Sequence, residues 1–136
     1  MKLSPHFSLE ELTRSTTAQR LKINNIPDEV SLTNLRTLCE KILQPIRNKF
    51  RAPLIITSGY RSLRLNKAVG SSNSSQHLFG QAADFVSNDN KRLWSLILEM
   101  IEKKEIRVGQ LINEKNLSWI HISLPTEKHI NEILKL

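Results

Sequence analysis

The pattern of hydrophobic positions predicts one long helix in the first half of the chain. Seven apolar residues recur at steps of three and four and form a single stripe: Leu35, Leu38, Cys39, Ile42, Leu43, Ile46 and Phe50. Ser31 is a suitable N-cap for this helix, and Pro45 is expected to kink or divide it. Ser8 and Glu11 have capping-box spacing and predict an earlier short helix, whereas the following stretch to about residue 30 is polar and irregular.

Shorter apolar runs predict the strands of a small sheet. Residues 54–57 and 82–86 are typical of buried strands, and residues 109–113 and 118–123 of an antiparallel hairpin. Helices are expected over residues 62–69 and 93–101, with a last short helix from Thr126, and residues 70–75 form a loop rich in Gly, Ser and Asn. Mixed helices and strands in 136 residues indicate a single α+β domain over 1–136, with helices packed on a mostly antiparallel sheet.

The charge distribution favours an anionic partner. The net charge is +7, and residues 41–67 contain seven basic side chains and no acidic one. Nucleic acid, an acidic wall polymer and a peptide with free carboxylates would all suit this excess, and a solvated basic face is the simpler alternative. Aromatic residues are only 5% and show no stacking pattern, so we expect no nucleic-acid partner.

Other features of the composition limit the setting of the protein. No apolar run is long enough to span a membrane, and residues 1–6 lack the apolar core of a secretory signal, which predicts synthesis in the cytoplasm without a signal peptide. The single cysteine, Cys39, cannot form an internal disulfide and is interpreted as a buried hydrophobic residue. A chain of this length is expected to be a monomer.

Two histidines and one aspartate are the candidate metal ligands. Asp84 lies between Ala83 and Phe85 in a predicted strand, where a carboxylate is costly unless it is paired or bound to a metal. His77 precedes it by seven residues, and His121 lies in a later apolar strand. Two His and one Asp are a common catalytic zinc set that leaves a position for water, although satisfied polar residues are the alternative on spacing alone. His6 and His129, near the ends of the chain, are interpreted as surface residues.

These residues form a recognisable motif. The pattern Ser75-x-His77-x-x-Gly80-x-Ala82-x-Asp84, with the later Trp119-Ile120-His121, resembles the zinc D-Ala-D-Ala carboxypeptidase family. Relatives in that family include vancomycin-resistance dipeptidases, phage L-alanyl-D-glutamate endolysins and the hedgehog signalling domain. Residues 57–62 and 65–70 are also similar to the family, and the resemblance covers about residues 7–125. It implies a hedgehog/DD-peptidase-like fold and one Zn²⁺ ion held by His77, Asp84 and His121. The sequence does not exclude manganese or cobalt at the same site.

The resemblance also implies roles for residues around the metal. Arg61 would bind a carboxylate or carbonyl of the substrate, and Ser75 would contact substrate or His77 or else cap the loop. Gly80 would permit the tight turn between the first two ligands, and Gln76 lies close enough in sequence to reach the site.

The general base is the one role for which this chain departs from the family pattern. Many family members carry an acid three residues before the last His, but that position is Ser118 here. Glu114 is the only acid between Glu105 and His121. It would be the base if the hairpin turns it toward the metal, and an exposed turn acid beside Lys115 otherwise.

The resulting functional hypothesis is zinc-dependent hydrolysis of peptide bonds in peptidoglycan stem peptides or cross-links, as a carboxypeptidase or an endopeptidase. With no signal peptide, a phage or prophage lysin that acts on the cell wall is the expected setting. The alternative is a metal-containing module that binds cell wall or protein without hydrolysis, because Ser118 cannot serve as a base.

Overall fold

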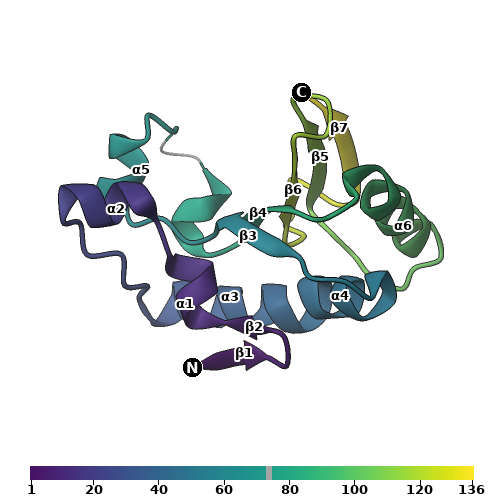
Figure 1. Cartoon of the computed structure of the whole chain (residues 1–136), viewed down its shortest axis with the longest axis horizontal. Coiled ribbons are helices and arrows are strands. Elements are labelled where there is room, and N and C mark those ends of the chain that lie inside the picture. Colours follow the sequence, from purple (N-terminus) through teal and green to yellow (C-terminus); the bar gives the residue numbers. More distant parts are fainter. Residues whose placement is uncertain (73–74) are drawn as a thin grey trace.

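The computed structural model describes residues 1–72 and 75–136 and has an α+β architecture (Figure 1). Its main sheet contains, in spatial order, β3 (Ile55–Ser58), β4 (Ala82–Val86), β6 (Trp119–Ser123), β5 (Gln110–Glu114) and β7 (Glu132–Lys135). All neighbouring pairs are antiparallel except β5 and β7, which are parallel. The predicted fold class and the hairpin of β5 and β6 are therefore confirmed.

The predicted long helix is present as three consecutive segments, α3 (Glu29–Leu38), the π-helical η1 (Cys39–Leu43) and α4 (Gln44–Phe50), which lie in one row in Figure 1. The helix begins earlier than predicted, because Asp28 and not Ser31 is the N-cap, and its side chain accepts a hydrogen bond from the Ser31 backbone at 2.8 Å. Pro45 lies in the first turn of α4 and does not break the row. A proline lacks an N–H and its ring crowds the preceding turn, and the wider π-turn before it gives the chain room to continue.

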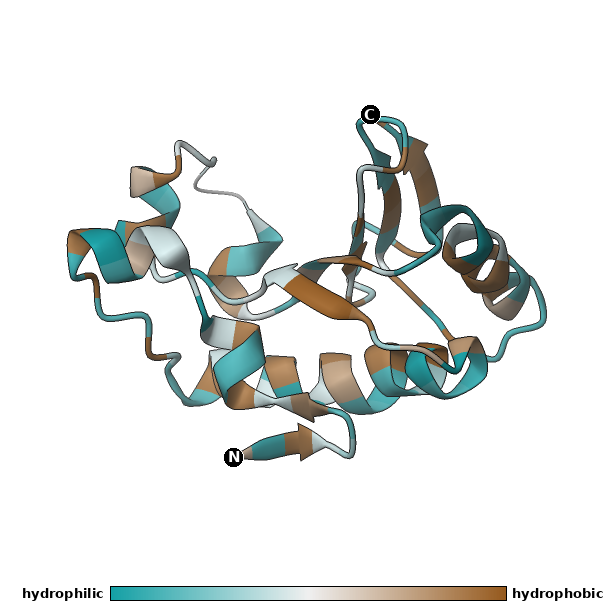
Figure 2. Cartoon of the chain, in the orientation of Figure 1, coloured by the Kyte–Doolittle hydropathy of each residue, from teal (hydrophilic) through white to brown (hydrophobic). Residues whose placement is uncertain are grey.

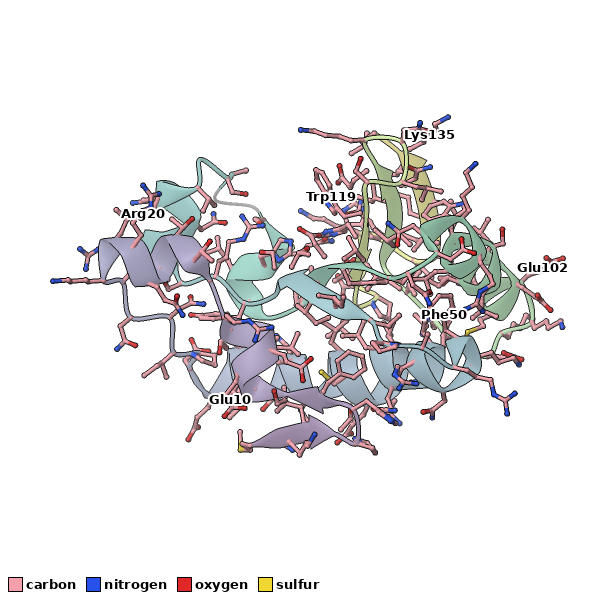
Figure 3. All side chains as sticks on the ribbon, viewed as in Figure 1. Glu10, Arg20, Phe50, Glu102, Trp119 and Lys135 are labelled. Atoms are coloured by element: carbon pink, nitrogen blue, oxygen red, sulfur yellow. The ribbon has the colours of Figure 1, made fainter. Side chains whose placement is uncertain are left out.

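The core lies between this helical row and one face of the sheet. Phe85, Ile120 and Leu111 are fully buried there, on strands β4, β6 and β5. Helix α6 (Asn90–Glu102) packs against α4 at one end of the core. Phe50, the last residue of α4, lies near α6 (Figure 3). The Arg92 guanidinium of α6 is 3.8 Å from the Phe50 ring centroid. Figure 2 shows β3 as largely hydrophobic and the helical row as alternately hydrophobic and hydrophilic, as expected for a helix with one buried side.

The N-terminal part contains more structure than the sequence predicted. Strands β1 (Lys2–Ser4) and β2 (Phe7–Ser8) form a small hairpin, and the predicted capping box of Ser8 and Glu11 starts α1 (Leu9–Thr13). The stretch interpreted as irregular contains α2 (Thr16–Leu21), which Ser15 caps by accepting a hydrogen bond from the Ala18 backbone. This helix is too short to show a hydrophobic period, so only its cap could have indicated it.

The middle and the end of the chain complete the fold. The predicted helix over 62–69 is α5 (Leu63–Ala68), and the 3₁₀ turn η2 (Gln76–Phe79) precedes β4. Two residues of the predicted loop over 70–75, residues 73 and 74, lie outside the described part of the chain. The expected C-terminal helix is wrong, because this segment forms turns and then β7, whose backbone pairs with β5. Among the helices that the structure describes, none is long and apolar enough to cross a membrane.

Candidate metal centre and cleft

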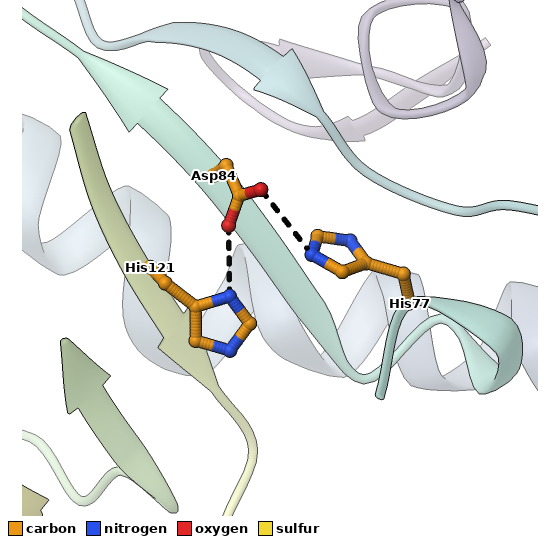
Figure 4. A group of neighbouring side chains, drawn as sticks. All are labelled: His77, Asp84 and His121. Carbon is orange, nitrogen blue, oxygen red and sulfur yellow. Dashed lines mark hydrogen bonds and ion pairs between the residues drawn. The ribbon is translucent and has the colours of Figure 1, made fainter. Parts of the chain in front are cut away.

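Strand register brings two of the candidate ligands together. Asp84 on β4 pairs directly with His121 on β6, so both side chains leave the sheet on the same face, opposite to the core. Asp84 Oδ1 lies 2.8 Å from His121 Nδ1. His77 reaches the same carboxylate from η2, with its Nε2 3.4 Å from Asp84 Oδ2 (Figure 4). One ligand atom from each residue lies within 4.8 Å of the others, which makes the group a candidate site for one metal ion.

The second nitrogen of each imidazole is held by a hydrogen bond away from the cluster. His77 Nδ1 lies 2.7 Å from the carbonyl oxygen of Gly59. Because a carbonyl only accepts, this nitrogen of His77 carries the proton, and a neutral ring then has a bare Nε2 that faces Asp84. His121 Nε2 lies 3.0 Å from Gln76 Oε1. Both rings thus have an outer polar partner of the kind that orients metal-binding histidines.

The electrostatics of the cluster fit a cation. Burial alone would raise the pKa of Asp84, but hydrogen bonds from His121 and His77 outweigh it and hold the pKa well below its usual value. Both imidazoles are nearly buried, with 3% exposure for His77 and 9% for His121. Either a proton on each facing imidazole nitrogen or a bound cation can stabilise this carboxylate, because a carboxylate and a bare nitrogen repel each other in a buried site. Two nitrogens and one carboxylate are a donor set that suits zinc.

Two glycines allow the ligand segments to approach their neighbours. A Cβ on Gly59 would lie 2.2 Å from the Leu12 carbonyl oxygen, which also accepts a 2.7 Å hydrogen bond from the Tyr60 backbone. Gly80 ends η2 with a φ of +69°, and a Cβ there would lie 2.4 Å from the Ser31 carbonyl oxygen. The tight turn predicted at Gly80 is therefore the end of η2, where Gly80 adopts the left-handed backbone conformation and packs against α3.

The cluster lies where two cavities meet. The larger, of about 750 Å³, is bordered by His121, and the smaller, of about 490 Å³, by Asp84, while Ser71 borders both. Other walls of the larger cavity include Ser75, Gln76, Gln110, Ile112 and Glu114. The smaller cavity is also lined by Arg14, Ser15, Thr16, Ser58 and Arg61. Each residue of the pair formed by Asp84 and His121 therefore borders one of the two cavities.

Arg61 faces the smaller cavity, and its backbone N–H donates to the His77 carbonyl at 3.0 Å. Its Nη1 donates to Asn66 Oδ1 at 3.2 Å. Among the residues that the structure describes, Arg61 Nε is the one buried side-chain nitrogen or oxygen without a hydrogen-bond partner. Burial lowers the pKa of its guanidinium, and Asp84 partly offsets this effect. A buried donor without a partner is costly, so a ligand acceptor at this position would be favourable.

Glu114 and Ser75 both border the larger cavity. Glu114 pairs with Trp119 across the hairpin, two residues from the pair of Ile112 and His121, so its side chain leaves the sheet on the same face as His121. Ser75 caps η2 by accepting a 3.2 Å hydrogen bond from the His77 backbone. Ser118, three residues before His121, donates its hydroxyl to the Lys115 carbonyl at 2.7 Å and lies in the hairpin turn.

Two groups of cleft residues were missed or misjudged from the sequence. Of the seven basic residues between 41 and 67, only Arg61 borders either of these two cavities, and Lys49 instead pairs with Glu105 at 2.9 Å. Arg14, from the turn before α2, is the other basic residue of the smaller cavity. His129 is not a plain surface residue, because it borders the larger cavity and its Nδ1 lies 2.7 Å from Glu132 Oε2.

A model of a known protein family matches most of this chain. The family model described as Peptidase M15 matches residues 5–123, which includes all three candidate ligands, Arg61, Ser75 and Glu114. A search of curated proteins finds no match. Residues 124–136 lie beyond the matched range, and they contribute residues 126–129 to the wall of the larger cavity.

Proposed function

Since this chain belongs to the Peptidase M15 family and is a zinc metallopeptidase, as its sequence motifs indicated, we propose that it hydrolyses peptide bonds in peptidoglycan stem peptides or cross-links. The observation that carries the proposal is the position of Asp84. Its carboxylate bridges His77 and His121, whose outer nitrogens contact Gly59 and Gln76, at the junction of two open cavities.

In this proposal, His77 Nε2, His121 Nδ1 and the Asp84 carboxylate would hold one zinc ion. When bound, zinc supplies Lewis-acid chemistry, which polarises a carbonyl and makes a water molecule more acidic. The Gly59 carbonyl supports this role for His77, because it keeps the proton on Nδ1 and leaves Nε2 bare.

Glu114 is the proposed general base. It would accept a proton from the attacking water and return it to the leaving amine. Its support is its position on the cavity wall, on the same sheet face as His121. Ser118 could not take this role, because it has no acidic group and its hydroxyl is bound to the Lys115 carbonyl in the turn. The alternative of a binding module without hydrolysis rested on Ser118 and loses its support if Glu114 is the base.

Arg61 is the proposed partner of a substrate carboxylate or carbonyl. Its buried Nε has no acceptor within the described protein, and a guanidinium binds a carboxylate strongly through parallel N–H donors. Ser75 would contribute a hydroxyl in the larger cavity, where it also caps η2. Peptidoglycan stem peptides carry free carboxylates and suit such a site.

The two cavities favour a cut within a peptide over removal of one terminal residue. One opens beside Asp84 and the other beside His121, so a peptide has room on both sides of the bond that reacts. The cell wall is the proposed site of action, in a phage or prophage lysin.

The decisive experiment digests purified peptidoglycan sacculi and identifies the released fragments by mass spectrometry. We expect fragments from the wild-type protein, none after removal of metal with a chelator, and renewed release when zinc is added back. An Asp84→Asn protein is the matched control, because it keeps the size of the side chain and removes the charge. Zinc bound at one equivalent without release of any fragment would contradict the proposed hydrolysis, and the fragment masses would identify the bond.

A further inference from the structure

We propose that Gln76 is a positioning residue that keeps the proton of His121 on Nε2, so that Nδ1 faces the metal position beside Asp84. This inference rests on the proposed metal site and adds a residue that acts on it through a ligand. The contact that carries it is the 3.0 Å distance between Gln76 Oε1 and His121 Nε2.

A neutral imidazole has one N–H and one bare nitrogen, and its partners decide which is which. If Nε2 carries the proton, it donates to Gln76 Oε1, and the bare Nδ1 faces the Asp84 carboxylate 2.8 Å away. If Nδ1 carries the proton, it donates to Asp84, and the bare nitrogen then points away from the cluster. Only the first form offers His121 to the same ion as His77 Nε2.

The two histidines differ in how firmly their form is set. His77 contacts a backbone carbonyl, which only accepts, so its form is determined by the fold. His121 contacts a side-chain amide, which offers an acceptor at one atom and a donor at the other. The orientation of the Gln76 amide therefore selects which nitrogen of His121 carries the proton. Replacement of Gln76 should allow either nitrogen to carry it.

The position of Gln76 is itself well supported. It begins η2, directly before His77, and its backbone carbonyl accepts a 3.1 Å hydrogen bond from Gln81. His77 is tied to the strand exit by the hydrogen bond from the Arg61 backbone. One short turn thus supplies one ligand and orients another that lies 45 residues away in sequence.

The test measures zinc affinity by competition with a chelator in three variants. Gln76→Met removes the acceptor with little change in length and should weaken zinc binding by roughly 10- to 100-fold, the usual effect of losing an outer partner. Gln76→Glu keeps an acceptor and should bind zinc within about threefold of wild type or more tightly, as in carboxylate–histidine–zinc arrangements. Gln81→Met is the matched control, because Gln81 borders the same cavity and its side chain contacts none of the three ligands in the described structure. It should leave the affinity unchanged.

Nitrogen-15 NMR of the imidazoles in the zinc-loaded wild-type protein gives a second readout, independent of any variant that fails to fold. We expect the proton of His121 on Nε2 and zinc on Nδ1. The reverse arrangement, or a Gln76→Met protein that binds zinc as tightly as wild type, would overturn the inference and leave the proposed function intact. A wild-type protein that binds no zinc would instead refute the proposed metal site, and with it the role of Gln76.

Discussion

Asp84 and His121 lie directly opposite each other on β4 and β6, with Asp84 Oδ1 2.8 Å from His121 Nδ1. The register that places them there also directs Phe85 and Ile120 into the core on the other face. A shift of one residue would bury the carboxylate and expose the apolar side chains, so core packing and metal site require the same register. The candidate metal centre is therefore stabilised by the hydrophobic core behind it.

The third ligand depends on contacts outside the sheet. His77 is held by the Gly59 carbonyl, and the segment after Gly59 is held in turn by the Leu12 carbonyl, which accepts from the Tyr60 backbone. Helix α1 therefore supports the site although it contributes no side chain to the cluster. The same segment leads directly into Arg61, so the metal ligand and the proposed substrate-binding residue are positioned together.

Replacement of the proposed base should separate catalysis from metal binding. We expect Glu114→Gln to keep one equivalent of zinc and to lower kcat by roughly 10²- to 10⁴-fold, the usual contribution of a general base. Release of fragments from sacculi and metal content of the same sample are the two measurements.

Ser118→Ala is the matched control for this variant, because the Ser118 hydroxyl contacts only the turn carbonyl of Lys115 in the described structure. It should keep normal turnover. A Glu114→Gln protein with normal turnover would remove Glu114 from the mechanism.

The metal site was largely predictable because two of its polar residues lie within otherwise apolar strands. An acid within the apolar run of β4 and a histidine between two isoleucines of β6 are costly unless they share a partner, so both stood out. The strands were predicted from their apolar runs, and the hairpin was predicted from the short turn between the last two of those runs. Glu114 was placed by this hairpin, since alternate residues of a strand share a face.

The features that were not predictable depend on contacts between distant segments. Strand β7 forms by pairing with β5, and nothing in residues 124–136 alone indicates that partner. Arg14 follows the end of α1 and borders the smaller cavity, which its sequence position does not indicate, and the π-turn before Pro45 has no sequence signature. Gln76 was expected close enough to reach the site, but its contact with His121 was not predictable, because a position beside one ligand does not say where a side chain points.

Loss of the Arg61 guanidinium should weaken substrate binding. A charged hydrogen bond is worth about 1.5–3 kcal/mol, so Arg61→Met should lower kcat/KM by roughly 10- to 100-fold, mainly through a higher KM. Arg64→Met is the control, because Arg64 lies exposed on α5 and borders neither cavity. Steady-state kinetics on a released stem peptide, with melting temperatures to check folding, are the measurements. Equal KM values for the two variants would argue against a substrate contact at Arg61.

Two glycines with the same backbone conformation should respond differently to alanine. Gly70 and Gly80 have φ of +76° and +69°, so alanine at either position costs about 1–2 kcal/mol in backbone strain. At Gly70 a Cβ would meet no atom of the described residues within 4 Å, whereas at Gly80 it would lie 2.4 Å from the backbone oxygen of Ser31. Gly80→Ala should therefore lower the free energy of unfolding more than Gly70→Ala, as measured by urea denaturation, and should also weaken zinc binding through η2. Equal decreases in the free energy of unfolding for the two variants would show that α3 moves away from the added Cβ at little cost.

The thiol of Cys39 should make the protein less stable at alkaline pH. Cys39 is fully buried, and this burial raises the pKa of its thiol to about 12, with smaller contributions from Glu11 and Glu40. An unfolded chain releases this proton near the ordinary thiol pKa of about 8.5, whereas the folded protein keeps it, so unfolding releases a proton and the free energy of unfolding falls as pH rises from about 8.5 to 12. At pH 10 the loss should be about 2 kcal/mol, and below pH 8 it should be less than about 0.2 kcal/mol. Urea denaturation of wild type and Cys39→Ala from pH 7 to 10 isolates this effect from other groups that titrate in the same range. Parallel pH profiles for the two proteins would mean that the thiol is already ionised or accessible in the folded state.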